Sequence, residues 1–471
     1  MLEDGLGDSQ QATVQSVAQE FEVGSEKIQE ITNYFVKQIK HGLKDKHAYQ
    51  IPSFVTQIPS GREKGLFLAV DLGGTNCRVC AVTLRGDSTF DVFQRKHLVP
   101  HDIRVHSSHK PLFHFIALKI QDLLREHKSS GSSDSSEACF NLGFTFSFTC
   151  EQTSISSGTL VHWDKGWDIP STLGQDPCAL LQEAIDEISL PVRVRVLAND
   201  AVGTLLTRAY TSKTKNSTLA SIILGTGTNA AYIERMSNIQ RLDTTADRAH
   251  HSNSDGFMVI NTEWGSWDDG LKVLPQTRFD KLVDESSSDP GCGLLEKMVS
   301  GMYLGELLRL SLLDLMRHGA LDMSFPDGSP VYIHMGIESA FLSKIAESKP
   351  ENSLSALSCI TDTLVATGVT SRDLRTIQML ATVIVKRSAR FVGAGLSAIL
   401  IQSGRLDTSD EVVDIAVDGS LFEFHTAFES FMRTALHDVE AIGKANEARI
   451  KIELTRDGSG TGAALIAAAA A

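Results

Sequence analysis

Four glycine-rich turns in this chain combine glycine with carboxylate, amide and hydroxyl residues that can bind phosphate. They lie at residues 71–76 (DLGGTN), 225–229 (GTGTN), 418–420 (DGS) and 457–462 (DGSGTG). Each follows an apolar run or precedes a helical pattern, and glycine lets backbone N–H groups come close to phosphate oxygens. One such turn would be weak evidence, whereas four predict a phosphate-rich ligand such as a nucleotide.

The first turn adds groups that suit a nucleotide with its metal ion. Asp71 offers a carboxylate that can hold Mg²⁺ directly or through water. Thr75, Asn76 and Arg78 add donors for phosphate, although Arg78 could also be a mere surface charge. The chain has no GxxxxGK[ST] loop and no HRD-type catalytic loop, which excludes the P-loop and protein-kinase routes to phosphoryl transfer. A different nucleotide-binding fold is required.

Apolar runs beside the turns predict the elements that position them. Residues 67–70 and 79–84 indicate two strands that flank the first turn, and residues 221–224 indicate the strand before the second turn. Further strands are expected at 141–148 and 412–417, and helices at 16–43, 293–318, 373–403 and the C-terminus.

One further strand ends at polar residues. Residues 192–197 predict a strand that runs into Asn199 and Asp200, and residues 202–210 predict a helix after it. Active sites collect where a strand end meets a helix, so this pair is a candidate for catalysis.

The size and charge of the chain limit its architecture and partners. A chain of 471 residues is too long for one hydrophobic core, so two domains or two lobes around a cleft are expected. The net charge of −14 repels phosphodiester backbones, and no dense Lys/Arg stripe reverses it locally. Nucleic acid is therefore not an expected partner.

Cysteine usage and the chain ends predict a cytoplasmic protein. Seven scattered cysteines suit a reducing compartment, and Cys77 and Cys80 lie in a predicted strand where residues three apart face opposite sides. The N-terminus lacks the order of a signal peptide, and the apolar stretch 463–471 is about half the ~20 residues that span a bilayer. We expect no membrane partner and a packed C-terminal helix.

Eight strings in this chain resemble, in order, the motifs of the hexokinase and glucokinase family. They are LAVDLGGTNCRV, LGFTFSF, WDKGW, NDAVGT, ILGTGTNAAYIE, NTEWGSW, EKMVSGMYLGELLR and DGSGTGAALIAA, and they span nearly the whole chain. The resemblance implies an α/β, actin-like ATPase (ribonuclease H-like) fold. Its two lobes each carry a mixed sheet flanked by helices, and sugar and ATP meet in a cleft that closes over them.

The resemblance also implies site residues. Asp200 matches the family's general base, which takes the proton from the attacking sugar hydroxyl, although by its type it could simply cap a helix. Lys165 matches a sugar contact with a positive charge, and we expect it to act with Asp200 in catalysis. The implied sugar-binding residues are Ser147, Asp164, Lys165, Asn199, Asp200, Asn229, Glu263 and Glu296.

The implied ATP site uses the glycine-rich turns. Thr226 resembles the residue that touches the γ-phosphate, 418–420 resembles the adenosine side, and Asp71 belongs to the Mg²⁺ side. The implied ATP-binding residues are Asp71, Gly73, Gly74, Thr75, Asn76, Arg78, Gly225, Thr226, Gly227, Asp418, Gly419, Ser420 and Gly458.

The chain departs from the family on the sugar side. Where the family usually reads Thr-Lys-Gly-Phe, residues 164–167 read Asp-Lys-Gly-Trp, and Thr149, Ala201 and Trp267 replace a usual Pro, Thr and Phe. A carboxylate accepts hydrogen bonds and cannot donate them, so Asp164 would favour a ligand that presents N–H or O–H. Asp164 could equally pair with Lys165 or another cation.

The sequence therefore predicts a Mg²⁺-ATP-dependent hexose 6-kinase, working as a monomer or weak homodimer. The alternatives are an N-acetylglucosamine kinase, whose substrate is an amino sugar, and a sugar sensor with weak turnover. We expect an N-terminal helical segment on the large lobe (1–66), a small lobe (67–210), a large lobe (211–456) and a C-terminal helix that returns to the small lobe (457–471).

Overall fold

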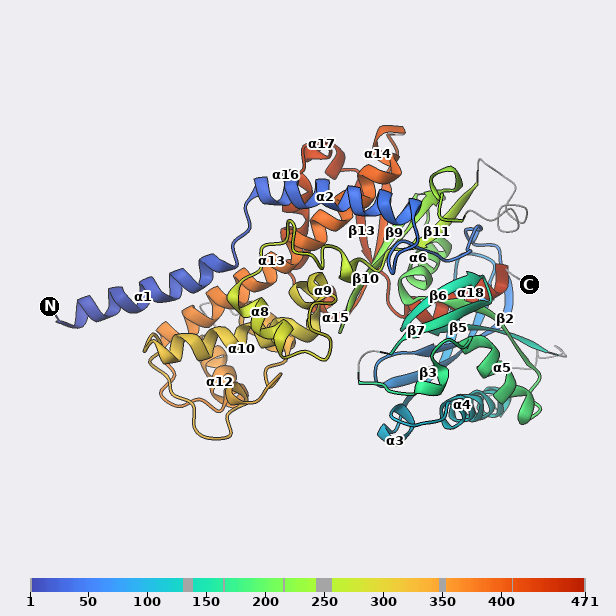
Figure 1. The fold of residues 1–471 in the computed structure, drawn as a ribbon, viewed down its shortest axis with the longest axis horizontal. Helices are drawn as coiled ribbons and strands as arrows, with labels where there is room; N and C mark the ends of the chain where they lie inside the picture. Colours follow the sequence, from blue (N-terminus) through green and yellow to red (C-terminus); the bar gives the residue numbers. More distant parts are fainter. Residues whose placement is uncertain are drawn as a thin grey trace.

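The computed structural model describes residues 2–129, 139–163, 166–214, 217–242, 256–346, 353–408 and 410–469. Within them, two large sheets carry helices on their faces (Figure 1). The small-lobe sheet has the order β4 (Phe90–Leu98), β3 (Asn76–Arg85), β2 (Lys64–Leu72), β5 (Phe140–Phe146) and β8 (Val192–Ala198). The large-lobe sheet has the order β1 (Ile51–Pro52), β11 (Phe257–Asn261), β10 (Thr228–Arg235), β9 (Thr218–Leu224), β12 (Val413–Asp418) and β13 (Ile450–Leu454).

Both faces of the small-lobe sheet are covered by helices. The covering helices are α4 (Lys110–Ser129) and α5 (Pro177–Glu187) on one face, and α6 (Asp200–Thr211) and α18 (Gly458–Ala469) on the other. Leu68 and Val70 of β2 pack toward α4, whereas Ala69 between them packs toward α18. Cys77 and Cys80 likewise belong to the two different clusters, which confirms that these buried thiols face opposite sides of the sheet.

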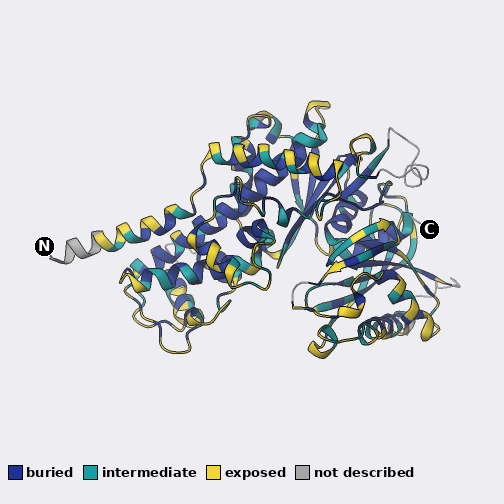
Figure 2. Cartoon of the chain, in the orientation of Figure 1, coloured by how far each residue is buried: buried dark blue, intermediate teal, exposed yellow. Residues whose placement is uncertain are grey.

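One long helix organises the core of the large lobe. Helix α13 (Ser371–Ser403) begins at a capping box between Thr370 and Asp373 and ends at Gly404, which is left-handed with φ 61°. It is buried along most of its length (Figure 2). Helix α2 (Ser25–Lys44) and helix α16 (Phe428–Asp438) pack against it.

Two of the expected helical regions each contain a break. The helical pattern at 16–43 is confirmed as two helices, because α1 (Leu2–Glu20) ends before Gly24, whose extended backbone caps the start of α2. The pattern at 293–318 is also interrupted. Ser300 has an extended backbone and separates α9 (Leu294–Val299) from α10 (Gly301–Arg317).

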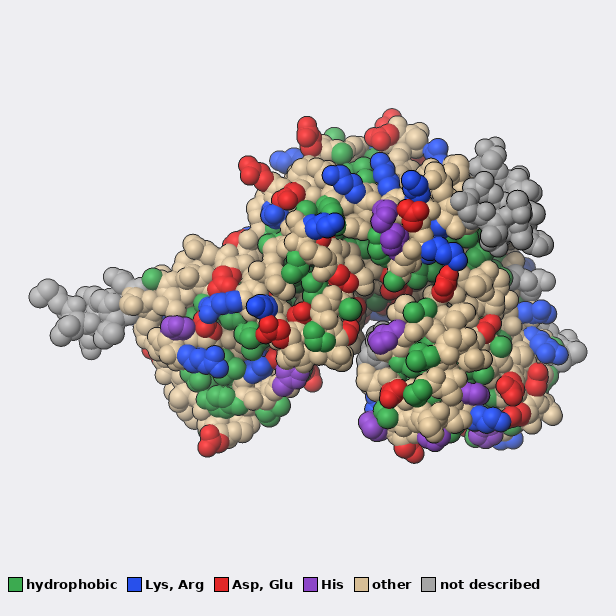
Figure 3. Space-filling model, in the orientation of Figure 1, with side chains coloured by type: hydrophobic (Ala, Val, Ile, Leu, Met, Phe, Trp, Pro, Cys, Tyr) green, Lys and Arg blue, Asp and Glu red, His purple; other side chains and the backbone are tan. Residues whose placement is uncertain are grey.

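Helix α18, the expected packed C-terminal helix, lies against α6 and the small-lobe sheet. A Cβ on Gly462 would lie 2.0 Å from the carbonyl oxygen of Gly203, so only glycine allows the two helices to touch here. Helix α6 also contacts β9 and β10, and thus joins the two sheets. Figure 3 shows the surface hollowed between the two lobes. No helix in the described ranges is long and apolar enough to cross a membrane.

Candidate active site

A chain of side-chain hydrogen bonds links the two sheets on the predicted sugar side. Asn229 Nδ2 donates to Asn199 Oδ1 at 3.3 Å and to Asn261 Oδ1 at 2.9 Å. Asn261 Nδ2 donates in turn to Glu263 Oε1 at 2.8 Å. Asn199 follows β8 of the small-lobe sheet, and Asn229 and Asn261 belong to β10 and β11 of the large-lobe sheet. This hydrogen-bonded network of amides therefore holds acceptor-rich groups from both lobes in one place.

Asp200 lies directly beside this amide network, at the start of α6. Asn199 is the N-cap of the helix, and its Oδ1 accepts from Ala201 N at 2.8 Å. Asp200 is the first helical residue, where the helix dipole favours a negative charge, and its Oδ1 also accepts from Ala201 N at 2.8 Å. The N-cap role considered for Asp200 is filled by Asn199, and the Asp200 carboxylate lies next to the amide network.

The two predicted sugar-side glutamates are positioned in different ways. Glu263 has a left-handed backbone with φ 47°, a costly conformation for a residue with a side chain. Glu296 Oε2 accepts from Thr228 N at 3.0 Å, and a Cβ on Gly227 would lie 2.7 Å from the same oxygen. Glycine at 227 therefore makes room for Glu296 beside the second turn.

The first glycine turn closes on itself and touches the C-terminal helix. Gly73 N donates to Asn76 O at 3.0 Å, and Ser459 Oγ of α18 donates to Asp71 Oδ2 at 2.7 Å. Asp71 belongs to β2 rather than to the turn, directly opposite Arg78 of β3. Arg78 forms an ion pair with Asp457 at 2.6 Å. The predicted phosphate donor Arg78 is thus engaged with a carboxylate.

The second and third turns meet at Asp418. A Cβ on Gly419, whose φ is 134°, would lie 2.2 Å from Leu224 O, so glycine lets the two turns touch. Gly458 N donates to Asp418 Oδ2 at 3.2 Å. Burial raises the pKa of Asp418 to about 6, and the negative charges of Asp457 and Asp200 add to the shift against the N–H of Gly458 and the charge of Arg78.

An indole ties the predicted sugar loop to the first turn. Trp167 Nε1 donates to Gly74 O at 2.6 Å. The Trp167 ring is buried, stacks on Trp163 with centroids 5.3 Å apart and meets Phe148 edge-on at 5.2 Å. This link makes the positions of the loop and of the phosphate turn depend on each other.

The structure gathers most of the predicted residues but not all. Asp164 and Lys165 lie outside the described residues. Ser147 follows β5, with its N–H bonded to Leu72 O at 3.2 Å. Thr75, Thr226 and Ser420 are exposed at the turns, and Ser420 opens α15 (Ser420–Phe424).

Three further residues complete this arrangement and were not predicted from the sequence: Asn261, Trp167 and Ser459. Asn261 stands two residues before Glu263 in the string NTEWGSW, and Ser459 stands in DGSGTG, so both were within motifs already noticed. Trp167 was noticed as a departure only. Its hydrogen bond depends on tertiary contact and has no signal in the sequence.

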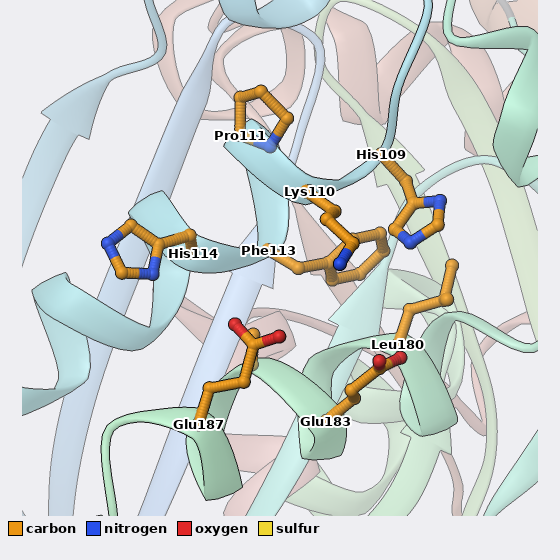
Figure 4. Close-up of a pocket in the computed structure, with 9 residues that line it drawn as sticks. His109, Lys110, Pro111, Phe113, His114, Leu180, Glu183 and Glu187 are labelled. Carbon is orange, nitrogen blue, oxygen red and sulfur yellow. The ribbon is translucent and has the colours of Figure 1, made fainter.

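A separate cavity of about 270 Å³ lies between α4 and α5 (Figure 4). Phe113, Leu180 and Ala184 supply apolar lining, while His109, Lys110, Pro111, His114, Glu183 and Glu187 complete it. None of the predicted site residues lines this cavity. It is therefore distinct from the candidate active site.

The chain is similar to known proteins along most of its length. Two family models described as Hexokinase match residues 13–210 and 219–469. A glucokinase of Aspergillus niger is 42% identical over 96% of this chain and 95% of its own length. Hexokinase-1 of Saccharomyces cerevisiae is 37% identical over 95% of this chain and 90% of its own length. A Schistosoma mansoni hexokinase structure complexed with glucose superposes with a TM-score of 0.83 at 34% identity, covering 98% of this chain and 99% of that one.

Proposed function

The chain belongs to the hexokinase family, and from that premise we propose that it transfers the γ-phosphate of ATP to the 6-hydroxyl of a hexose. It is a hexose kinase with the actin-like ATPase fold, since near-full-length relatives and a matching structure carry that activity and fold. ATP as the donor, the 6-hydroxyl as the acceptor and the residue roles are the proposed parts. The main observation that supports the proposal is the hydrogen-bonded amide network from Asn199 to Glu263, which begins beside Asp200.

In the proposed reaction Asp200 is the general base. Its carboxylate accepts the proton of the sugar O6–H while O6 attacks the γ-phosphorus, the bond from that phosphorus to the bridging oxygen breaks, and ADP leaves with the electron pair. Asn199, Asn229, Glu263 and Glu296 offer the acceptors that a ring of sugar hydroxyls needs. Ser147, Asp164 and Lys165 remain predicted members of this pocket, and Lys165 a predicted catalytic residue.

ATP is proposed to lie along the glycine-rich turns. Asp71 and Asp418 are hard oxygen donors of the kind that Mg²⁺ prefers, so the residues present fit the ion. Bound there, Mg²⁺ would neutralise charge on the transferring phosphate. The backbone of residues 73–76 and 225–227 is proposed to bind phosphate oxygens, with 418–420 and Gly458 toward the nucleoside.

The remaining expectations stay proposals. They are the division of the chain at residues 66, 210 and 456, a monomer or weak homodimer, a cytoplasmic location and no nucleic-acid or membrane partner. The odd, scattered cysteines support the cytoplasmic location, and the negative net charge of −14 supports the proposal that nucleic acid is not a partner.

The test is coupled ADP release from Mg²⁺-ATP with glucose, fructose, mannose, glucosamine and N-acetylglucosamine offered separately. Turnover of glucose or fructose is expected. Asp200→Asn should lower kcat by roughly 10²- to 10⁴-fold, as loss of a general base does. Asp186→Asn, which changes an exposed carboxylate on α5, is the matched control, and its kcat should equal that of the wild type.

The pattern of turnover separates the alternatives. Activity with N-acetylglucosamine alone would replace the hexose assignment with an amino-sugar kinase. Sugar binding without ADP release would indicate a sensor. Full activity of the Asp200→Asn protein would contradict the general-base assignment.

A further inference from the structure

Three side chains away from the candidate active site present metal ligands to one another. His41 lies in the last turn of α2, Asp45 caps that helix, and His47 follows two residues later. One ligand atom from each lies within 4.8 Å of the other two. His41 and Asp45 are 54% and 55% exposed, whereas His47 is half-buried. Two imidazoles and one carboxylate thus converge where solvent can reach them.

The hydrogen bonds of this His41–Asp45–His47 cluster leave coordinating atoms available. Nδ1 of His41 lies 3.2 Å from Tyr49 Oη, while its Nε2 lies 3.7 Å from Asp45 Oδ2, beyond a normal hydrogen bond. Nε2 of His47 is buried without a hydrogen-bond partner. Burying an unpaired polar atom costs free energy, which a bound ion or its water would recover.

Two cations near the cluster have partners other than its ligand atoms. Arg241 is fixed by the carbonyl oxygens of residues 42, 47, 49 and 50. Lys46 is paired with Glu151 at 3.1 Å.

We propose that His41, Asp45 and His47 bind a divalent transition-metal ion of the Zn²⁺ type, with water completing its coordination. Ligand atoms on one Zn²⁺ lie roughly 3.4 Å apart when its bonds are about 2.1 Å long. The ligand atoms in the structure lie within 4.8 Å of one another, and two of the three side chains, His41 and Asp45, are exposed rather than packed.

The ion would fasten the end of α2 to the segment that enters β1. Gln50 N in that segment donates to Thr262 O at 3.1 Å, and Ile51 pairs with Asn261. The site therefore braces the edge of the large-lobe sheet from outside the sugar pocket. Its existence does not depend on the proposed phosphoryl transfer.

The proposal is tested by titrating ZnCl₂ into the full chain, stripped of metal by a chelator, with calorimetry and thermal unfolding as readouts. Wild-type protein is expected to bind one equivalent tightly and to unfold at a higher temperature with Zn²⁺. His41→Ala and Asp45→Asn should each weaken that binding at least roughly 10-fold and abolish the thermal shift. Both residues are exposed, so neither change should prevent folding.

His318→Ala is the matched control. His318 is 57% exposed and lies 3.7 Å from Asp314 four residues earlier, which copies the His41–Asp45 pair without a third ligand. This variant should bind Zn²⁺ as the wild type does. Absence of tight binding by the wild type, or equal binding by the His41 and Asp45 variants, would overturn the proposal.

Discussion

The sugar side and the phosphate side of the candidate site are built in different ways. On the sugar side, neutral amides bond to one another from Asn199 through Asn261 to Glu263. On the phosphate side, glycine turns close on themselves, and carboxylates gather around the start of α18. The sugar side is thus a connected network of side chains, whereas the phosphate side consists of backbone turns surrounded by negative charge.

This difference indicates how each side is made ready for its ligand. A connected amide network holds its acceptors in position before a sugar arrives, which lowers the entropy cost of binding. Burial raises the pKa of Asp418, the nearby charges of Asp457 and Asp200 raise it further, and a cation beside them would relieve that repulsion. We therefore expect activity with the sugar to fall when the geometry of the amide network is disrupted. On the phosphate side, we expect stability and activity to depend on charge and pH.

The largest effect should come from breaking the amide network. Asn261→Ala removes the bonds to Asn229 and Glu263, so both would lose their fixed orientation. We expect kcat/KM for glucose to fall roughly 10²-fold, because a site that hydrogen-bonds hydroxyls depends strongly on each group. The KM for ATP should change little. Steady-state kinetics with each substrate varied in turn measures both.

Asn238→Ala is the control for this change. Asn238 is an exposed amide in the large lobe that bonds to Glu234 away from the site. Its loss should leave both kinetic parameters near wild type. Equal losses for glucose and ATP in the Asn261→Ala protein would erase the distinction between the two sides.

Local patterns in the sequence predicted the elements that carry the site. Glycine turns next to apolar runs located β2, β3 and β9, and the strand before Asn199 was found from the four apolar residues Val192, Val194, Val196 and Leu197 of β8. These features are encoded within a few residues. The break at Gly24 was missed because the apolar period continues across it through buried Phe21 and Ile28.

The partners across the site could not be predicted in this way. Asn199, Asn229 and Asn261 are distant in sequence and meet only because the two sheets approach each other. The pairing of Arg78 with Asp457 likewise joins residues 379 positions apart. Residue types suggested donors and acceptors, but which donor meets which acceptor is decided by tertiary packing.

A smaller effect should come from removing one charge on the phosphate side. The pKa of Asp418 in the folded protein, about 6, lies above its ordinary 3.8. Between these values the folded protein keeps a proton that the unfolded chain has released, so its stability falls as pH rises through about 6. Asp418→Asn removes this loss. We therefore expect the free energy of unfolding of this variant at pH 8 to exceed that of the wild type by about 1–3 kcal/mol.

That advantage should shrink toward pH 4, where wild-type Asp418 is protonated. Urea unfolding of both proteins at several pH values measures it, and Asp186→Asn on the exposed side of α5 serves as the control. A constant difference across this pH range would mean that Asp418 carries no raised pKa. Activity should fall in the same variant, since the carboxylate is proposed to serve the metal side.

The smallest effect should come from the link between the two sides. Trp167→Phe keeps a buried ring against Trp163 and Phe148 but removes the donor to Gly74 O. Loss of one hydrogen bond costs about 1 kcal/mol, so kcat/KM should fall roughly 3- to 10-fold. Because the bond joins the sugar loop to the phosphate turn, the decrease should appear for glucose and ATP together.

Trp163→Phe separates this coupling from a general loss of packing. Trp163 Nε1 donates to Ile169 O at 3.1 Å and Thr172 Oγ1 at 2.7 Å, neither of which belongs to the phosphate turn. Loss of the Trp163 indole N–H should lower the free energy of unfolding by about 1 kcal/mol. It should not lower kcat/KM for glucose and ATP together. If Trp167→Phe affects glucose alone, the two sides act independently, and the indole merely packs the sugar loop. A joint decrease confined to Trp167→Phe would instead mean that this one hydrogen bond fixes the position of the sugar loop relative to the first glycine turn.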